Sequence, residues 1–559
     1  MNRKDRRRAA HHENSGKALT SHGIGARSSG AAALLSAAER LHNSGRFSEA
    51  AELCKTVLAE DRQDAMALLI LGSSASELGD AKAAGAFLQQ SVALRPGDAR
   101  AWVVLGTHLL RAGDGEAALA ACQTALRVAP RFAPAHVALG SIHASARNYA
   151  LAEAAFRGAL ALAPTLVEAE INLGSALFCL GRYEDAAAAQ RRALALQPNH
   201  IHALKNLAAS LRALGNYGEA LAVYRQAVAA APHFAEAHRD EALLLLLLGQ
   251  FEEGWTKYEW RLRASTRGAA PIEGPRWSGE HRAGGTILLQ AEQGIGDTIQ
   301  FLRYAPLVAQ RCDRVILNLP ASLTRLGGEA LSAAAQRTTL AEPLPPFDCH
   351  CTLLSLPRIF ATSLDNMPAC TSYLCAPPGS GEGWRREFAG DGRIRVGIAW
   401  AGNPDHENDH NRSIPFAHLL PLLGDRQVQF YSLQVGERAA DLRAVADGDV
   451  TDLSGRLGDF ADTAGAIEAL DLVISVDTAV AHLAGALGKP VWLLLPYVPD
   501  WRWLLDRDDS PWYPTMRLFR QARRGDWDEV VARVARELGL IVRRALIEGR
   551  APAMNPAGA

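Results

Sequence analysis

The sequence of 559 residues predicts an α-helical solenoid followed by two α/β lobes with parallel sheets. In the first half, Leu-Gly pairs recur every 34 residues, as at Leu71-Gly72 and Leu105-Gly106. A fixed period of this length is typical of stacked structural repeats. After residue 285, apolar runs of strand length alternate with helical segments. This alternation favours parallel, doubly wound sheets.

The composition excludes several classes of protein. The formal net charge is −1, so no overall field indicates binding to nucleic acid or to a membrane surface. The basic start Met1–Arg8 is not followed by the apolar core of a secretory signal, and no run of about 18 apolar residues predicts a membrane span. Eight scattered cysteines suit a reducing compartment, so we expect a cytoplasmic protein. Residues 1–30 are polar and predict a disordered tail.

Three series of residues keep the 34-residue period. Small residues let the two helices of a unit approach closely, glycines end the first helix, and prolines close the second. The first series is Gly72, Gly106, Gly140 and Gly174. The second is Gly45, Gly79, Gly113, Arg147, Gly181, Gly215 and Gly249. The third is Pro96, Pro130, Pro164, Pro198 and Pro232.

This triple coincidence resembles the tetratricopeptide repeat and predicts about seven units over residues 31–268, stacked into a solenoid with a concave groove. Asn172 and Asn206 hold one repeat position. Their amides are suited to hydrogen bonding with a peptide backbone in an acceptor groove, although solvated asparagines are the alternative. Whether the solenoid forms a homo-oligomer stays open.

The last unit changes character. Trp255, Tyr258 and Trp260 have helical spacing and predict a capping helix that docks on the next domain, with ligand stacking as the alternative. Residues 269–284 are rich in Gly, Pro and Arg and predict a linker.

The first α/β lobe is expected over residues 285–385, with strands at 286–290, 314–319 and 347–355. Gly294 and Gly296 permit a tight turn after the first strand, and Asp297 stands where a helix would begin. This geometry carries an acidic side chain to the carboxyl end of a strand, where open α/β sheets bind ligands. The spacing of Cys349, His350 and Cys351 matches no common zinc site, so no metal is expected.

The second lobe is expected over residues 390–540, followed by a tail at 541–559. Its predicted strands are 394–400, 428–433, 470–476 and 490–495, and a helix is predicted at 477–487.

Two motifs carry a family resemblance. Residues 294–298, Gly-Ile-Gly-Asp-Thr, resemble the N-terminal loop of heptosyltransferase-like (family 9) glycosyltransferases, and residues 475–482, Ser-Val-Asp-Thr-Ala-Val-Ala-His, resemble their nucleotide-sugar motif. The resemblance, over roughly 285–535, implies a GT-B pair of Rossmann-like lobes, a nucleotide-sugar donor, inverting transfer, and no cofactor or essential metal.

The site residues follow from residue type and position. Asp297 is the candidate base that takes the acceptor proton, and a helix N-cap is its structural alternative. Asp477 and Thr478 open a helix whose backbone N–H groups suit a phosphate, and Asp477 itself is expected as the N-cap or as an acceptor for a sugar hydroxyl. His482, one turn on, is a candidate for contact with the diphosphate or sugar, or else a core histidine.

Most of the remaining donor-binding candidates lie outside the two motifs. Arg412, in a segment resembling the family's basic segment, is a candidate to neutralise the leaving group. Glu437 follows a strand end and a glycine and is suited to accept from ribose hydroxyls. Trp501, with Arg502 beside it, is a candidate to flank the base or sugar. Gly294 and Gly296 complete the donor-binding set through close backbone approach.

Two classes of function remain open at this point. The first is a glycosyltransferase whose repeats present a protein or peptide acceptor, with a lipid-linked or surface glycan as the alternative acceptor. The second is a non-catalytic scaffold that retains a degenerate nucleotide-sugar-binding domain.

Overall fold

The structure is a computed structural model that describes residues 29–264, 272–368, 370–389, 392–406, 408–444 and 449–548. The predicted tail at 1–30 therefore lies almost wholly outside the described residues, as do the start of the predicted linker and residues 549–559. The chain divides into two compact units, between Asn206 and Leu207. This division falls among the repeats rather than at the predicted linker.

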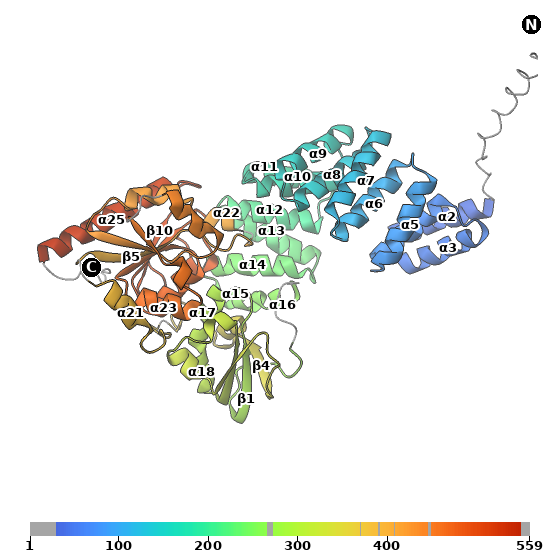
Figure 1. Cartoon of the computed structure of the whole chain (residues 1–559). Coiled ribbons are helices and arrows are strands. Elements are labelled where there is room, and N and C mark those ends of the chain that lie inside the picture. Colours follow the sequence, from blue (N-terminus) through green and yellow to red (C-terminus); the bar gives the residue numbers. More distant parts are fainter. Residues whose placement is uncertain are drawn as a thin grey trace, which may run out of the picture. The chain divides into compact units, whose positions relative to one another are not determined.

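The described residues before 259 form seven antiparallel helix pairs, which Figure 1 shows as paired helices. The pairs are α2 (Ser29–Asn43) with α3 (Phe47–Glu60), α4 (Ala65–Glu77) with α5 (Ala81–Leu94), α6 (Ala99–Arg111) with α7 (Gly115–Val128), α8 (Ala133–Ser145) with α9 (Tyr149–Leu162), α10 (Val167–Cys179) with α11 (Tyr183–Leu196), α12 (Ile201–Ala213) with α13 (Tyr217–Ala230), and α14 (Ala235–Leu247) with α15 (Phe251–Tyr258).

The periodic small residues do what their spacing predicts. A Cβ added to Gly140 would lie 2.5 Å from Phe156 Cε1, and one added to Gly106 would lie 2.7 Å from Cys122 Sγ. Real Cβ atoms do not make such contacts, so a glycine is required where the paired helices meet. The solenoid prediction is confirmed at this level.

The glycines that end the first helix of each pair adopt left-handed backbone, with φ of +79° at Gly45 and +86° at Gly113. Arg147 takes the same place in the fourth pair with φ of +59°. A side chain in this conformation is strained, because Cβ approaches the following carbonyl oxygen. The repeat therefore imposes this backbone conformation even where the residue is not glycine.

The last repeat packs on the first α/β lobe, as the capping-helix prediction states. Trp255 Nε1, on α15, donates to the carbonyl oxygen of Thr362 at 3.0 Å. The short helix α16 (Arg261–Ala264) follows. The described end of the predicted linker is also packed, since Trp277 is buried and its backbone N–H donates to His350 O at 2.9 Å.

The first lobe holds a parallel sheet with strand order β3-β2-β1-β4 among the described residues. The strands are β1 (Arg282–Gln290), β2 (Cys312–Leu319), β3 (Gln336–Thr339) and β4 (Cys349–Thr352). Helix α17 (Ile295–Phe301) follows β1 directly, and α20 (Leu356–Ile359) lies just beyond β4.

The second lobe holds a parallel sheet with strand order β10-β9-β8-β5-β6-β7. The strands are β5 (Ile394–Ala399), β6 (Val428–Ser432), β7 (Val450–Asp452), β8 (Leu472–Val476), β9 (Val491–Leu495) and β10 (Met516–Arg520). The helices in this part of the chain are α21 (Ser380–Glu387), α22 (Asp409–Arg412), α23 (Phe460–Glu468), α24 (Ala479–Ala486) and α25 (Trp527–Glu548).

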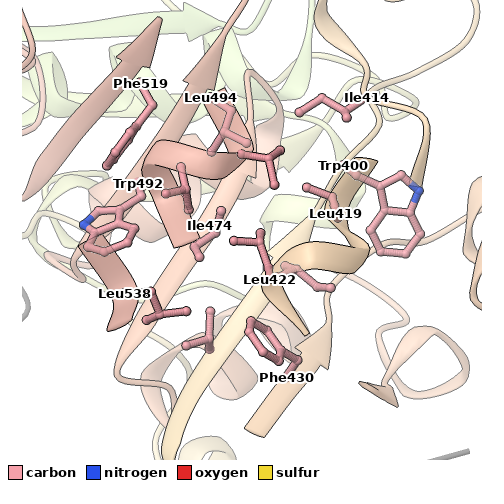
Figure 2. Close-up of a cluster of buried hydrophobic side chains, with 14 of the residues drawn as sticks. Trp400, Ile414, Leu419, Leu422, Phe430, Ile474, Trp492, Leu494, Phe519 and Leu538 are labelled. Carbon is pink, nitrogen blue, oxygen red and sulfur yellow. The ribbon is translucent and has the colours of Figure 1, made fainter. Parts of the chain in front are cut away.

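One apolar cluster covers a face of the second sheet (Figure 2). Ile474, Trp492 and Phe519 from three strands meet Leu419, Leu422 and Leu538. Leu538 belongs to α25, which runs to Glu548 and so into the segment predicted as a tail. Val542 in that extension is buried in the same cluster, which explains why the helix continues.

Candidate active site

The strand order of the second lobe indicates where a ligand would bind. From β5 the chain proceeds to β6 and β7 on one side, then crosses to β8, β9 and β10 on the other. Ligands of open α/β sheets bind outside the carboxyl ends of the strands at such a reversal. The segment after β5 carries Arg412, and the segment after β8 carries Asp477, Thr478 and His482. The fold therefore places four predicted site residues at this switch point.

Asp297 is the third residue of α17, in the first lobe, and is not the residue that caps the N-terminus of that helix. The helix begins at Ile295 with Gly294 as its N-cap. Asp297 Oδ2 accepts a hydrogen bond of 2.8 Å from the Gly294 N–H. The predicted N-cap alternative for Asp297 is thus wrong in position, because the side chain reaches back to the cap from the first turn.

Arg502 joins this carboxylate to the second lobe. It follows β9 and its guanidinium contacts Asp297 Oδ1 and Gln300 Oε1 of α17. On its own side it donates to Asp500 Oδ1 at 2.7 Å. Burial raises the pKa of Asp297, while Arg502 and the Gly294 N–H lower it, and the net shift is upward. Asp297 is therefore held by both lobes.

Asp477 and His482 lie close together in the second lobe, and both side chains are largely buried. Asp477 Oδ2 accepts from Trp503 Nε1 at 2.9 Å, and its Oδ1 lies 3.7 Å from His482 Nε2. His482 Nδ1 is 2.8 Å from the Tyr513 hydroxyl. Burial, followed by the charge of Asp500, raises the pKa of Asp477 to about 6. Burial and the positive charges of Arg502 and Arg412 hold the pKa of His482 well below its ordinary value, so the imidazole is neutral.

One detail of the start of α24 differs from the prediction. Thr478, rather than Asp477, is the N-cap of α24, and its Oγ1 lies 3.1 Å from Ser475 Oγ. Gly296 has a packing role: a Cβ there would lie 2.8 Å from His482 Cδ2. The glycine therefore lets α17 of the first lobe approach α24 of the second.

Arg412 and Glu437 both follow strand ends. Arg412 Nε lies 3.4 Å from Asp409 Oδ1, and its guanidinium covers Gly402, just beyond β5. Glu437 is exposed beyond the carboxyl end of β6, which is the neighbour of β5 on the side away from β8. The structure thus brings Arg412 to the switch point and leaves Glu437 one strand away.

The side chain of Trp501, predicted to flank the base or sugar of the donor, is buried in an aromatic cluster. It is only 3% exposed and lies among Trp255, Phe301 and Trp512, with ring centroids 5.2–6.4 Å away. The aromatic rings fill this space, so none of the Trp501 face remains to flank a base or sugar. The prediction that Trp501 binds the donor is therefore wrong.

Asn172 and Asn206 line one groove of the first unit. The groove has a volume of about 840 Å³ and lies between α10 and the start of α12, with Ile171, Ser175 and Lys205 also on its wall. Asn206 Nδ2 donates to Ser175 Oγ at 3.1 Å. Amide groups at one repeat position, in a groove of mixed polar and apolar lining, are suited to hydrogen bonding with an extended peptide backbone.

Metal-binding clusters and membrane-spanning helices are both absent from the described residues. These residues contain no group of three or more His, Cys, Asp and Glu side chains that is placed to hold a metal ion. Their helices also include none with the length and apolar character needed to cross a membrane.

Sequence reasoning missed the way in which two arginines fasten the lobes together. Arg502 was expected beside a ligand rather than against Asp297. Arg303, 2% exposed, donates to Trp512 O at 2.5 Å and to the Tyr373 hydroxyl at 3.1 Å. The partners of Arg303 lie 209 and 70 residues away, so no local pattern could reveal these contacts.

Comparison with known proteins supports both halves of this description. Models of the tetratricopeptide repeat match residues 41–104, 103–167 and 165–233. A model of glycosyltransferase family 9 (heptosyltransferase) matches residues 414–494, which hold β6 to β8, α24 and most of β9.

Among curated proteins, the chain is 25% identical over 318 residues to Protein FlbA of Caulobacter vibrioides, covering 51% of this chain and 52% of that protein. The match thus spans about half the length of that relative. Among solved structures, a thermophilic tetratricopeptide protein of Thermus thermophilus is 29% identical, with 32% of this chain and 98% of that chain covered and a TM-score of 0.31. The Cut9–Hcn1 hetero-tetramer of the APC/C is 21% identical, with 41% and 45% covered and a TM-score of 0.38. Taken together, residues 41–233 of this chain match the tetratricopeptide repeat, and residues 414–494 match glycosyltransferase family 9 (heptosyltransferase).

Proposed function

We propose that this protein is a glycosyltransferase that moves a sugar from a nucleotide-sugar donor to a protein or peptide acceptor, with inversion and without a metal ion, in the cytoplasm. The proposal rests mainly on the ion pair between Asp297 and Arg502. It joins the first lobe to the second beside the switch point. A transferase needs such a place, because donor and acceptor must react between groups of fixed geometry.

The reaction assigns a role to each group. Asp297 accepts the proton of the acceptor hydroxyl while that oxygen bonds to the anomeric carbon. The bond from that carbon to the donor phosphate breaks on the opposite face, and the nucleoside diphosphate leaves with the electron pair. Arg412 and the N-terminal N–H groups of α24 are suited to stabilise the charge on the leaving group. The neutral imidazole of His482 and the carboxylate of Asp477 are suited to hydrogen bonds with sugar hydroxyls.

The repeats are the reason for proposing a protein or peptide as the acceptor. Tetratricopeptide repeats are protein-binding elements, and Asn172 and Asn206 share one groove. Binding through backbone contacts would hold a polypeptide segment with little dependence on its side chains. A lipid-linked acceptor has no backbone of this kind for the amides to bind.

The test is release of nucleotide from a panel of nucleotide sugars in the presence of cell lysate, by wild type and by Asp297→Asn. Loss of a general base lowers kcat by about 10²- to 10⁴-fold. The matched control is Asp365→Asn, an exposed aspartate of the first lobe, which should keep the wild-type rate. Labelled sugar recovered in protein would support the acceptor, whereas label recovered only in lipid would contradict it. A wild-type rate in Asp297→Asn would remove Asp297 as the base.

One observation favours the second candidate function, a non-catalytic scaffold. Both carboxylate oxygens of Asp297 are already bonded, to the Gly294 N–H and to Arg502. An acceptor hydroxyl must therefore compete with these two partners for the carboxylate oxygens. Binding of a nucleotide sugar with no release in the presence of lysate would support the scaffold.

A further inference from the structure

The last repeat inserts an arginine into the first lobe at that lobe's own switch point. The strand order β3-β2-β1-β4 reverses between β1 and β4. Arg261, on α16, lies at the carboxyl ends of these two strands and is 2% exposed. A crevice of this kind usually receives a ligand. Here a side chain from the repeats occupies it.

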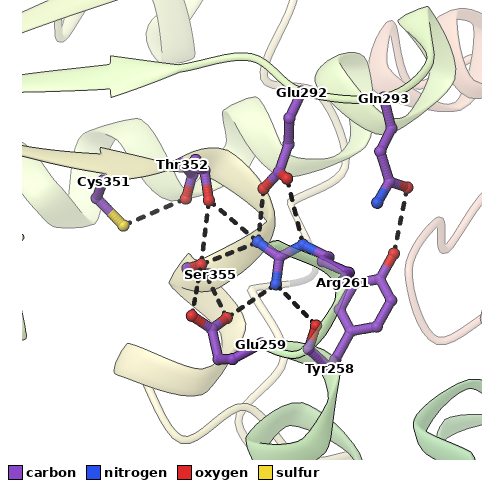
Figure 3. Close-up of polar contacts among 8 residues, drawn as sticks. All are labelled: Tyr258, Glu259, Arg261, Glu292, Gln293, Cys351, Thr352 and Ser355. Atoms are coloured by element: carbon purple, nitrogen blue, oxygen red, sulfur yellow. Dashed lines mark hydrogen bonds and ion pairs between the residues drawn. The ribbon is translucent and has the colours of Figure 1, made fainter. Parts of the chain in front are cut away.

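The contacts of Arg261 use every nitrogen of its guanidinium (Figure 3). Its Nη2 and Nε approach the two carboxylate oxygens of Glu292, beyond β1, at 2.5 and 3.3 Å. Nη2 also donates to the hydroxyls of Thr352, the last residue of β4, and Ser355, just beyond it, at 3.0 and 2.9 Å. Glu259 accepts from Nη1 at 2.9 Å and completes the ion-pair group. These contacts require the forked guanidinium of an arginine, because the compact ammonium group of a lysine cannot reach all of the acceptors at once.

Tyr258, from the same turn, contacts the next residue of the first lobe. Its hydroxyl donates to Gln293 Oε1 at 3.2 Å. Gln293 has φ of +60°, a conformation that a side chain of this size adopts only when neighbours hold it. The following residue is Gly294, whose N–H donates to Asp297. Three consecutive residues, Glu292 to Gly294, therefore connect the repeat to Asp297.

We propose that Tyr258 and Arg261 of the last repeat are positioning residues for the glycine loop at residues 292–297 and thereby set the orientation of Asp297. The proposal rests on the proposed function of Asp297 as base. It makes the last repeat a part of the catalytic unit rather than only a carrier of the acceptor. Adhesion of the repeat to the lobe does not require these two residues, because Trp255 already packs there and bonds to Thr362.

The test uses the full-length chain with two variants and one control. Tyr258→Phe removes only the hydroxyl that holds Gln293, and Arg261→Lys keeps the charge but loses the fork. The control is Lys257→Met, on the same turn, which breaks a 2.8 Å ion pair with the fully buried Glu241 inside the repeat. The carboxylates that Lys257 pairs with, Glu241 and Glu253, both belong to the last repeat, so this variant reports the effect of lost stability alone.

Two readouts separate positioning from stability. The first is kcat and the donor KM for nucleotide release. We expect kcat to fall about tenfold or more in both variants, with the donor KM within about twofold, because misplaced reacting groups lower kcat. The second is amide hydrogen exchange of the segment 291–301, which should speed up in both variants. Lys257→Met should change neither readout, although its melting temperature falls.

Unchanged kcat together with unchanged exchange in Tyr258→Phe would overturn the proposal, even if Arg261→Lys failed to fold. An equal fall of kcat in Lys257→Met would also overturn it, since the effect would then be one of stability. If wild type released no nucleotide from any donor, the proposed function would fail. The exchange measurement would still decide whether the repeat holds the loop.

Discussion

Replacing Asp477 by asparagine should stabilise the protein, and by an amount that depends on pH. The side chain lies at the start of α24 and is 14% exposed. Burial and the neighbouring charge of Asp500 raise its pKa from an ordinary 3.8 to about 6. Asparagine keeps an oxygen for the 2.9 Å bond from Trp503 Nε1, and it carries no charge to bury.

The magnitude and the sign follow from linkage. At about 1.36 kcal/mol per pKa unit, a rise from 3.8 to about 6 corresponds to about 3 kcal/mol. The raised pKa means that the folded state binds the proton more tightly than the unfolded chain does. The stabilisation of the folded state by this bound proton is thus complete below pH 3.8, and it is lost as the pH rises through about 6. The free energy of unfolding of Asp477→Asn should therefore exceed that of wild type by up to about 3 kcal/mol at a pH of about 7.5.

Urea unfolding of both proteins at several values between about pH 4.5 and 7.5, followed by circular dichroism, measures this difference. The chain has two compact units, so the curves are fitted with two transitions, and only the transition of the unit from Leu207 onward should move. An increment that stays constant across this pH range would refute the reasoning, because a packing effect has no such dependence. A variant less stable than wild type at the upper end of the range would refute it more directly.

Two further predictions concern the repeats. Gly140→Ala should lower the free energy of unfolding of the first unit by about 1–3 kcal/mol, because the new Cβ would lie 2.5 Å from Phe156 Cε1. Gly115→Ala, in the preceding helix pair and with no atom within 4 Å of its Cβ, is the matched control and should not destabilise in calorimetry. Arg147→Gly should raise the melting temperature, since glycine relieves a φ of +59° that costs a side chain about 1 kcal/mol. A lower melting temperature for Arg147→Gly would contradict the strain argument.

The strands show which parts of the fold a sequence can predict. The central strands β1, β2, β5, β6, β8 and β9 are buried apolar runs, and each was predicted. The strands that were missed are β3, β7 and β10, which are three of the four edge strands, whereas the fourth, β4, was predicted. An edge strand has one neighbour and needs no continuous apolar run, as the residues Gln336–Thr339 of β3 illustrate.

In the candidate site, the sequence predicts local features but not contacts between distant residues. Glycine spacing before Asp297 and the strand–helix junction at Thr478 are local, so the sequence located both. The contact of Arg502 with Asp297 joins residues 205 positions apart, and only the packing of two lobes creates it. The prediction treated Trp501 and Arg502 alike, although Trp501 turns into the aromatic core and Arg502 turns toward α17.

Under the proposed function, the ion pairs of Arg412 and Arg502 indicate which of the two arginines could stabilise a departing diphosphate. Arg502 contacts two carboxylates, Asp297 and Asp500, so its charge is already compensated. Arg412 pairs with the carboxylate of Asp409, and this contact is 3.4 Å long. It lies over Gly402, where a Cβ would come within 2.5 Å of its Nη2. The glycine therefore makes the space in which the guanidinium reaches the switch point. Under the proposed function, Arg412 is thus the better candidate of the two to meet the leaving group, whereas Arg502 contacts Asp297 of the first lobe and Asp500 of its own lobe.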